Sequence, residues 1–319
     1  MNKIASALLV FMSFASSLAP AEEPVKLRSL APQPVAVQRE TVNFRMSYDV
    51  KAGSRTSLVD LTVLIPQTLA QRQIIRRMTF SHTPTRIFEA DGNKYAQFTL
   101  VEPKGHTLVT VDVEADLHQF DYSTALADVR ADGEPRLEYL AAERYLEKDD
   151  GRIRAAAAGV VGETLDQTLR GLFRYVVQTI RPVSYQAPDV GALRAMETRR
   201  GDCTEYADLL VALCRSRNIP ARFSEGYITK HSTMLKHDWV EIFLPQHGWV
   251  PFDPALTRVG LASFEKMEPI YICLSNVRND RTLANGHYWF YRYLGDAIKV
   301  TDDFSVGGMP ALTAVDKRN

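Results

Sequence analysis

Arg200-Gly201-Asp202-Cys203-Thr204-Glu205-Tyr206-Ala207 marks a sharp turn followed by the start of a helix. Asp202 can cap this helix, and Glu205 stands three residues later, as in a capping box. Hydrophobic residues then recur at helical spacing on one face, at Cys203, Ala207, Leu210, Val211 and Cys214. Asn218 and Pro220 end the pattern. We therefore expect Cys203 at the N-terminal tip of a buried helix.

The position of Cys203 favours ionisation of its thiol. Only the thiolate is a strong nucleophile, and a free thiol has a pKa of about 8.5. The unpaired N–H groups of a helix N-terminus and a nearby protonated histidine both lower that pKa. The alternative is that Cys203 is a small buried hydrophobic residue, which is what we expect of Cys214 and Cys273.

Two later segments supply an imidazole and a carboxylate. His237-Asp238-Trp239-Val240-Glu241-Ile242 alternates like a β-strand, with His237, Trp239 and Glu241 on one face. Gly248-Trp249-Val250-Pro251-Phe252-Asp253-Pro254 follows a turn and predicts the return strand of an antiparallel hairpin. A loop of odd length would place Asp253 on the face of His237, and a loop of even length would place it on the opposite face. The sequence leaves this register open. A strand histidine and an aspartate before proline also have ordinary structural uses.

The three segments together resemble the core motifs of the transglutaminase-like superfamily. These motifs are a Gly-x-Cys at a helix start, a His-x-Trp-x-Glu strand and a Gly-Trp-x-x-x-Asp-Pro strand, and here they stand in the family's order. The resemblance covers residues 136–305. It implies a papain-like Cys-His-Asp core with Cys203 as the nucleophile, His237 as the general acid–base and Asp253 as the residue that orients the imidazole.

The resemblance also suggests two further residues around the site. Tyr185 is the candidate for the hydrogen-bonding side chain that the family often has near the oxyanion, and its alternative is an aromatic residue packed at the domain edge. Trp239 is expected to line the site as one of its walls without taking part in the chemistry. Asp238 departs from the family pattern, in which alanine is common, and as the next strand residue it should point away from His237.

Composition excludes several classes of function. The chain has 38 basic and 38 acidic residues, so no strong field attracts it to nucleic acid or to an acidic membrane surface. Its three cysteines form no Cys-x-x-Cys pair, and we expect no metal site, no cofactor and no disulfide framework. The sequence does not decide whether Cys214 and Cys273 form a single disulfide. The other histidines (His82, His106, His118, His231, His247 and His287) are expected at the surface.

The N-terminus predicts export. Lys3 precedes an apolar stretch from Ile4 to Leu18, and Ala19-Pro20-Ala21 offers a cleavage site. An uncleaved anchor is the alternative, but the stretch is short for a membrane span. We therefore expect a signal peptide over residues 1–21, a periplasmic or secreted protein, and no transmembrane segment after cleavage.

The rest of the chain predicts an α+β fold. Residues 22–36 are rich in proline and predict a linker. Short strand-like runs between turn signals predict an N-terminal β-sandwich over residues 37–125. Residues 136–305 predict the transglutaminase-like core, in which helices pack on an antiparallel sheet. Thr164 and Gln167 mark the start of one amphipathic helix there. Residues 306–319 are expected to form a mobile tail.

We expect a thiol acyl-transfer enzyme that acts on a protein or peptide amide, with cell-envelope proteins as one class of substrate. A thioester on Cys203 would be resolved by water, as in a cysteine peptidase or amidase, or by an amine, as in a transglutaminase. The motifs do not choose between these acceptors, although the resemblance leans towards hydrolysis. Two alternatives stay open: a catalytically inactive binding or scaffold protein of the cell envelope, and a processing factor dedicated to one partner.

Overall fold

The computed structural model describes residues 38–69, 72–122, 137–185, 187–231, 235–244 and 247–307. The predicted signal peptide and linker lie outside these ranges, as does the predicted tail except for Val306 and Gly307. Within these ranges no helix combines the length and the apolar character needed to cross a membrane.

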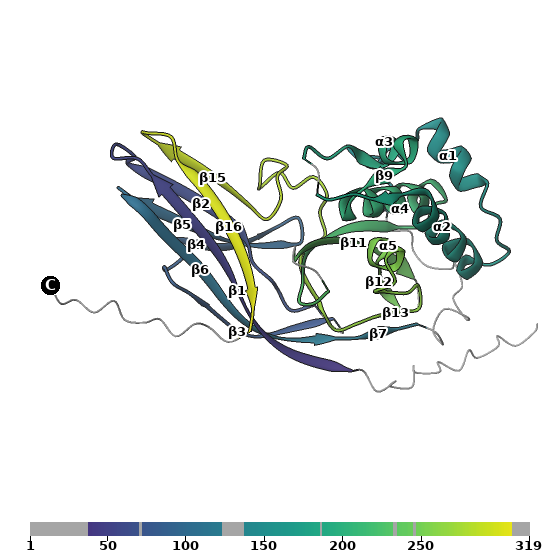
Figure 1. Ribbon diagram of the computed structural model, residues 1–319, viewed down its shortest axis with the longest axis horizontal. Coiled ribbons are helices and arrows are strands. Elements are labelled where there is room, and N and C mark those ends of the chain that lie inside the picture. Colours follow the sequence, from purple (N-terminus) through teal and green to yellow (C-terminus); the bar gives the residue numbers. More distant parts are fainter. Residues whose placement is uncertain are drawn as a thin grey trace, which may run out of the picture. The chain divides into compact units, whose positions relative to one another are not determined.

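Two antiparallel sheets combine the first strands of the chain with two strands near its end (Figure 1). Their orders are β16-β1-β6-β3 and β15-β2-β5-β4. The strands are β1 (Arg39–Ala52), β2 (Leu58–Leu64), β3 (Gln73–Phe80), β4 (Arg86–Ala90), β5 (Asn93–Val101), β6 (Gly105–His118), β15 (Trp289–Leu294) and β16 (Lys299–Val306). Alternate strand residues such as Met46, Leu61 and Val111 are buried in one hydrophobic cluster that both sheets share.

The strands β15 and β16 come after the helical part of the chain. In the pairing with β2, Trp289 lies opposite Val63, and in the pairing with β1, Val300 lies opposite Val50. Local sequence patterns do not indicate these pairings, because the paired strands lie far apart along the chain. As a result, the chain leaves these sheets after β6 and returns to them only at β15.

A third antiparallel sheet has the order β12-β11-β10-β14. Its strands are β10 (Ala221–Ile228), β11 (Lys236–Leu244), β12 (Gly248–Phe252) and β14 (Tyr271–Ser275). On one face Val240 and Ile242 share a hydrophobic cluster with helix α4 (Cys203–Ser216). On the other face Trp239 and Cys273 form a small cluster with Met267. The predicted combination of helices with antiparallel sheets is confirmed.

Short elements complete the helical part of the chain. They are η1 (Leu137–Tyr139), α1 (Gly151–Ala158), α2 (Leu165–Thr179), α3 (Gly191–Thr198) and α5 (Pro254–Arg258), with the paired strands β7 (Phe120–Asp121) and β13 (Lys266–Met267) and the paired strands β8 (Arg181–Pro182) and β9 (Arg200–Gly201). The Thr164 side chain accepts a hydrogen bond from the Gln167 N–H, which confirms the predicted start of α2.

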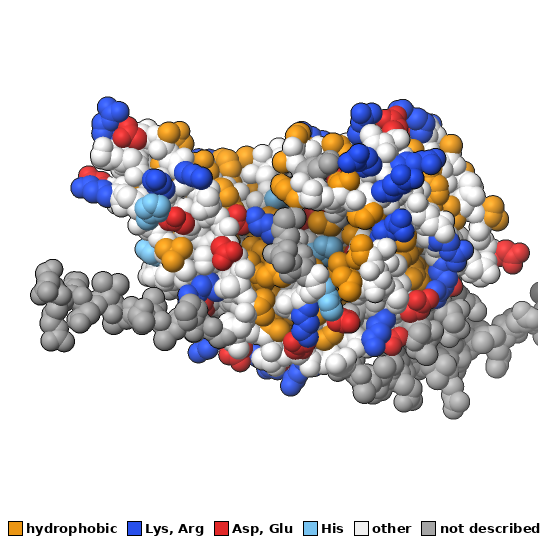
Figure 2. Space-filling model, viewed as in Figure 1, with side chains coloured by type: hydrophobic (Ala, Val, Ile, Leu, Met, Phe, Trp, Pro, Cys, Tyr) orange, Lys and Arg blue, Asp and Glu red, His pale blue; other side chains and the backbone are white. Residues whose placement is uncertain are grey.

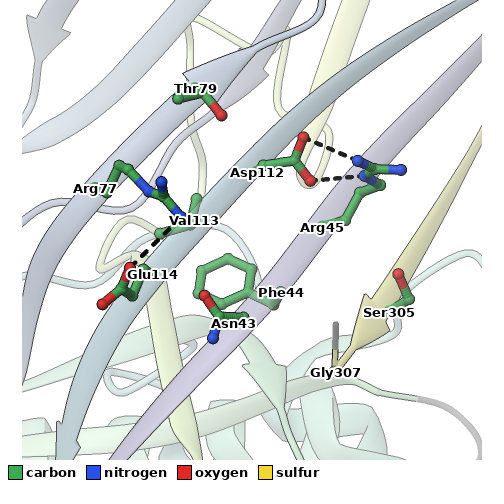
Figure 3. Close-up of a pocket in the computed structure, with 10 residues that line it drawn as sticks. All are labelled: Asn43, Phe44, Arg45, Arg77, Thr79, Asp112, Val113, Glu114, Ser305 and Gly307. Atoms are coloured by element: carbon green, nitrogen blue, oxygen red, sulfur yellow. Dashed lines mark hydrogen bonds and ion pairs between the residues drawn. The ribbon is translucent and has the colours of Figure 1, made fainter. Parts of the chain in front are cut away.

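A pocket lies on the sheet that contains β1, β3, β6 and β16 (Figure 3). Arg45 and Asp112, both on its lining, form an ion pair at 2.6 Å, and Arg77 lies 3.7 Å from Glu114. These charged side chains are matched in pairs across neighbouring strands, which is how sheets commonly satisfy surface charge. We therefore treat this pocket as structural.

Gly226 offers a test of the third sheet. It lies on β10 between β11 and β14, opposite His237 and Cys273. A Cβ there would overlap the backbone carbonyl oxygen of Ile272, so Gly226→Ala has to push two strands apart. We expect a loss of about 1–3 kcal/mol in the free energy of unfolding, measured with urea. Gly151→Ala is the control, since nothing lies within 4 Å of its added Cβ. An unchanged value for Gly226→Ala would contradict this packing.

Candidate active site

The predicted capping box forms the start of α4. The Asp202 side chain accepts a hydrogen bond from the Thr204 N–H at 2.9 Å, and the Glu205 side chain accepts one from the Asp202 N–H at 3.0 Å. A Cβ at Gly201 would overlap the side chain of Glu205, so the turn before the helix requires glycine. Cys203 is half-buried at the helix tip. Residues 204–215 are all buried, so α4 is a central helix rather than one with a single buried stripe.

The hairpin of β11 and β12 brings His237 and Asp253 together. Three residues separate the strands, so the loop is odd and Asp253 faces the same side as His237. His237 Nε2 lies 2.7 Å from Asp253 Oδ2. The same carboxylate accepts hydrogen bonds from the Tyr271 hydroxyl and from the Leu256 N–H, both at 2.8 Å. With Asp253 fully buried, these bonds fix the orientation of the imidazole.

The Asp253 contact changes the proton affinity of His237. Burial alone lowers the pKa of His237, but the charge and hydrogen bond of Asp253 outweigh it and raise the pKa above its usual value of 6.5. Asp238 and Asp202 act in the same direction. The ring is therefore well suited to accept and hold a proton.

Cys203 lies among carboxylates. Its Sγ is 3.9 Å from Asp238 Oδ2, and Thr204 donates a hydrogen bond to that same oxygen at 2.6 Å. Burial raises the pKa of the Cys203 thiol well above its usual value, and the charges of Asp238 and Asp202 raise it further. This direction is opposite to the expected effect of a helix tip and a histidine. The charges of Asp202, Asp238 and Asp253 act on both Cys203 and His237, so all these groups share one electrostatic environment.

The two predicted flanking residues differ in exposure. Trp239 is buried, with its ring centroid 6.4 Å from that of His237 and 5.3 Å from that of Tyr271. It also lines a pocket with Tyr271 and Met267. Tyr185 is 58% exposed, and burial together with the charge of Asp189 raises its pKa. The roles assigned to Tyr185 and Trp239 stay predictions.

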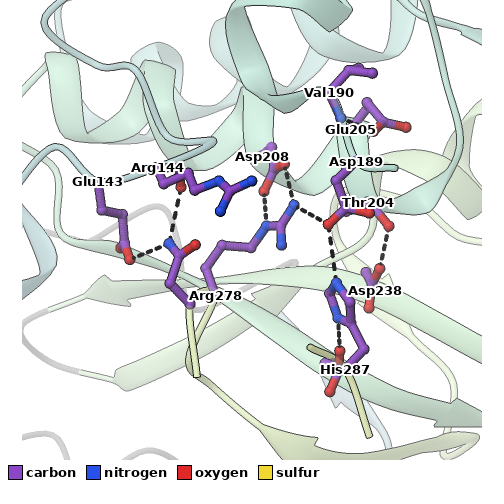
Figure 4. Close-up of polar contacts among 12 residues, drawn as sticks. Glu143, Arg144, Asp189, Val190, Thr204, Glu205, Asp208, Asp238, Arg278 and His287 are labelled. Atoms are coloured by element: carbon purple, nitrogen blue, oxygen red, sulfur yellow. Dashed lines mark hydrogen bonds and ion pairs between the residues drawn. The ribbon is translucent and has the colours of Figure 1, made fainter. Parts of the chain in front are cut away.

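The sequence did not predict the ionic cluster that lies beside the site (Figure 4). Arg278 contacts Asp208 of α4 at 2.7 Å and Asp189 at 2.7 Å. His287, expected at the surface, instead bridges Asp189 at 3.0 Å and Glu225 of β10. That expectation was wrong, because the partners of His287 lie far away in sequence. No local motif signals such a contact.

The charges in this cluster are strongly coupled. Burial alone lowers the pKa of His287, but Glu225 and Asp189 hold it at about 11, so the ring is a permanent cation at neutral pH. Burial raises the pKa of Asp208 to about 7 against the opposing charge of Arg278. The cluster therefore balances two cations, Arg278 and His287, against carboxylates beside the site.

Exposed arginines lie directly before the nucleophile helix. β8 and β9 pair in parallel with Arg181 opposite Arg200, and Arg199 precedes β9 as the C-cap of α3. Figure 2 shows Lys and Arg side chains gathered over the helical part of the face in view. Like charges opposite each other repel, so this arrangement costs stability. We call the three exposed residues Arg181, Arg199 and Arg200 the positive rim.

Cys203, Cys214 and Cys273 are all free thiols. The Cys214–Cys273 disulfide that the sequence left open is thus absent from the described structure. In the part of the chain that the structure describes, no three His, Cys, Asp or Glu side chains gather in a way that could hold a metal ion.

The His237–Asp253 contact gives a titration prediction. Asp253→Asn keeps the size of the side chain but removes its charge, so we expect the pKa of His237, followed by NMR, to fall. Because the wild-type pKa is raised, this pair stabilises the fold fully below a pH of about 6.5, and the contribution is lost as pH rises through the folded pKa. The stability difference between the two proteins should therefore shrink at higher pH. An unchanged His237 titration would refute the contact.

The ionic cluster gives a stability prediction. Arg278→Met keeps the length of the side chain but leaves Asp208 buried without its cation, which costs about 3–5 kcal/mol of unfolding free energy. The cost should increase with pH, since a protonated Asp208 tolerates burial better. Arg194→Met is the control, because its 3.6 Å ion pair with Glu197 is exposed and contributes little. Equal losses in the two variants would argue against a buried pair.

Comparisons with known proteins match part of the chain to a known family. Residues 154–254 match the family model of the transglutaminase-like superfamily. The uncharacterized protein YebA of Bacillus subtilis is 35% identical over 82 residues, which are 21% of this chain and 11% of that protein. The chain thus matches only a small part of the length of this relative.

One solved structure shares the fold, and a second is similar over part of the chain. A proposed cysteine protease from Cytophaga hutchinsonii is 16% identical and superposes with a TM-score of 0.58, covering 84% of this chain and 92% of that chain. The periplasmic domain of TgpA from Pseudomonas aeruginosa is 17% identical, with a TM-score of 0.37 over 68% of this chain and 88% of that chain. The tip of α4 and the hairpin of β11 and β12 fall within the matched residues, and the chain therefore contains a domain of the transglutaminase-like superfamily.

Proposed function

We propose that this protein is a thiol acyl-transfer enzyme in which Cys203 attacks a carboxamide or peptide carbonyl. The observation that carries the proposal is the buried 2.7 Å contact between His237 and Asp253, in a domain whose nucleophile helix begins at Cys203. The same three aspartates act on His237 and on the thiol at the tip of α4. An imidazole held by a carboxylate is the partner that nucleophilic catalysis by a cysteine requires.

The contact with Asp253 decides which nitrogen of His237 does the chemistry. Since Nε2 faces the carboxylate, it carries the proton in the neutral ring, and Nδ1 is left as the base. In the proposed reaction the Cys203 proton moves to Nδ1 as sulfur bonds to the carbonyl carbon. His237 then returns that proton to the leaving amine or ammonia when the C–N bond breaks. The product of this half-reaction is a thioester on Cys203.

The acceptor completes the reaction. Water gives deamidation or peptide cleavage, and an amine gives crosslinking, with His237 taking the proton of either acceptor. We favour water. Tyr185 is the proposed donor to the oxyanion, and Trp239 the proposed wall beside His237. The positive rim of Arg181, Arg199 and Arg200 favours acyl donors with acidic residues near the target amide.

The proposed location is the periplasm or the extracellular space, with proteins of the cell envelope as substrates. The apolar segment from Ile4 to Leu18 and the following Ala19-Pro20-Ala21 support export. The proposed arrangement of the polypeptide is a β-sandwich domain that is begun by the first strands and completed by β15 and β16, and that presents substrates to the catalytic domain. The shared hydrophobic cluster of the first two sheets supports the sandwich.

One observation favours a second candidate function. The pKa of Cys203 is raised by burial and by neighbouring carboxylates, and a thiol of this kind is a weak nucleophile at rest. A catalytically inactive binding or scaffold protein would retain such a thiol without cost. The two candidates differ in whether Cys203 reactivity depends on His237.

Site-resolved alkylation separates the candidates. Iodoacetamide reacts with the thiolate, so in the enzyme the rate at Cys203 at pH 7 should fall about tenfold or more in His237→Ala, because the proton acceptor is lost. The buried Cys214 and Cys273 serve as internal controls within the same mass spectra. A Cys203 that reacts equally slowly in both proteins would favour the scaffold.

Turnover is the complementary measurement. Wild-type protein and Cys203→Ala are incubated with an acidic, glutamine-containing peptide, with and without an added primary amine. Deamidation, cleavage or amine incorporation that Cys203→Ala abolishes would establish acyl transfer and identify the acceptor. Amine incorporation that exceeds hydrolysis would overturn our choice of water.

A further inference from the structure

Asp238 lies at the proposed nucleophile, although the sequence placed it merely on the opposite side of the strand from His237. Its Oδ2 is 3.9 Å from Cys203 Sγ. The same oxygen accepts a hydrogen bond from the Thr204 hydroxyl at 2.6 Å (Figure 4). Successive strand residues leave opposite faces, and the face of Asp238 is the one on which α4 packs. The tip of α4 therefore rests against a carboxylate.

This carboxylate is only partly satisfied. Asp238 is 6% exposed, and its Oδ1 has no hydrogen-bond partner within the described part of the chain. A buried carboxylate oxygen without a donor is costly, so a purely structural aspartate would be expected to bond through both oxygens. The nearby cation His287 is already engaged by Glu225 and Asp189. The charge of Asp238 is thus left to act on the thiol.

Titratable groups surround Asp238 on every side. They are Asp202 and Asp208 on α4, Glu225 on β10, His237 on its own strand, His287 and Tyr288 on the segment before β15, and Tyr185 before α3. Burial and the charge of Glu225 raise the pKa of Asp238 to about 6, while His287 and Thr204 oppose them. Its charge therefore changes close to neutral pH.

We propose that Asp238 controls the protonation of the nucleophile: its carboxylate keeps the proton on Cys203 Sγ, and loss of that negative charge allows the thiol to ionise beside His237. The inference rests on the proposed role of Cys203 as the nucleophile. At the pH where Asp238 takes up a proton, His237 already carries one, so the thiol proton leaves to solvent. The products are a thiolate, an imidazolium and a neutral carboxylic acid.

The physical basis is the repulsion between two anions. A thiolate beside an ionised Asp238 would place two negative charges about 4 Å apart in a buried site, which opposes ionisation of sulfur. Asp238 also favours the imidazolium of His237, but it contacts Sγ directly, so its effect on the thiol dominates. The carboxylate thus suppresses the reactive ion pair above pH 6 and permits it below.

The test is the alkylation rate of Cys203 in Asp238→Asn relative to wild type, measured between pH 4.5 and 8.5. Asparagine keeps the acceptor for Thr204 and removes the charge. We expect a ratio near one below about pH 5, where Asp238 is already neutral, rising through about pH 6 to about tenfold at pH 7.5. A ratio that is independent of pH, or that stays at one, overturns the proposal.

A second variant tests the same idea with the carboxylate in place. Thr204→Val removes the hydroxyl that stabilises ionised Asp238, so the pKa of Asp238 should rise and Cys203 should react faster than wild type at pH 7. An unchanged or slower rate contradicts the proposal, even if Asp238→Asn fails to fold. Asp280→Asn is the matched control, because it removes another buried carboxylate, one that contacts Asn93 and Tyr95 instead of Cys203.

A double variant separates this inference from the proposed function. If Asp238→Asn reacts faster at pH 7.5, and adding His237→Ala removes the gain, both the control by Asp238 and the proton transfer to His237 are supported. If the gain persists without His237, the role of Asp238 stands and the role of His237 as proton acceptor fails.

Discussion

The ion pair between Asp208 and Arg278 is the contact on which the rest of the site depends. Both side chains are almost completely buried, and they join the central helix α4 to the segment that leads into β15. A charged residue in the middle of a helix buried on nearly all sides requires a partner of opposite charge. Because Arg278 also holds Asp189, the same guanidinium fixes the segment that carries Tyr185.

The environment of Cys203 combines opposing effects. The backbone N–H groups at the tip of α4 favour a negative charge, whereas burial and three carboxylates disfavour it. The same carboxylates favour a proton on His237. A thiol in these surroundings is a resting form, and proton transfer to the imidazole becomes part of the reaction instead of a state formed in advance. Reactivity then depends on how few negative charges surround the sulfur at the moment of attack.

Local chemistry made part of this structure predictable. The capping box of Asp202 and Glu205 marked the start of α4, and Thr164 marked the start of α2, because caps involve residues only a few positions apart. The face of Asp253 depended on whether the hairpin loop was odd or even, which sequence alone left open. The positions of His287, Arg278 and Asp238 depended on tertiary contacts. So did β15 and β16, whose partners lie at the other end of the chain.

The route of the chain has a consequence for how the protein responds to strain. The helices and the third sheet lie between strands that belong to the same pair of sheets, so this part of the molecule is an insert tied down at both ends. The return segment binds α4 through Arg278 and binds β5 through the contact of Asp280 with Tyr95. A mechanical load on the first sheets, such as a partner pulling on their edges, would be transmitted through this return segment to α4, the helix that begins at Cys203. The β sheets therefore serve as the support to which both ends of the insert are anchored.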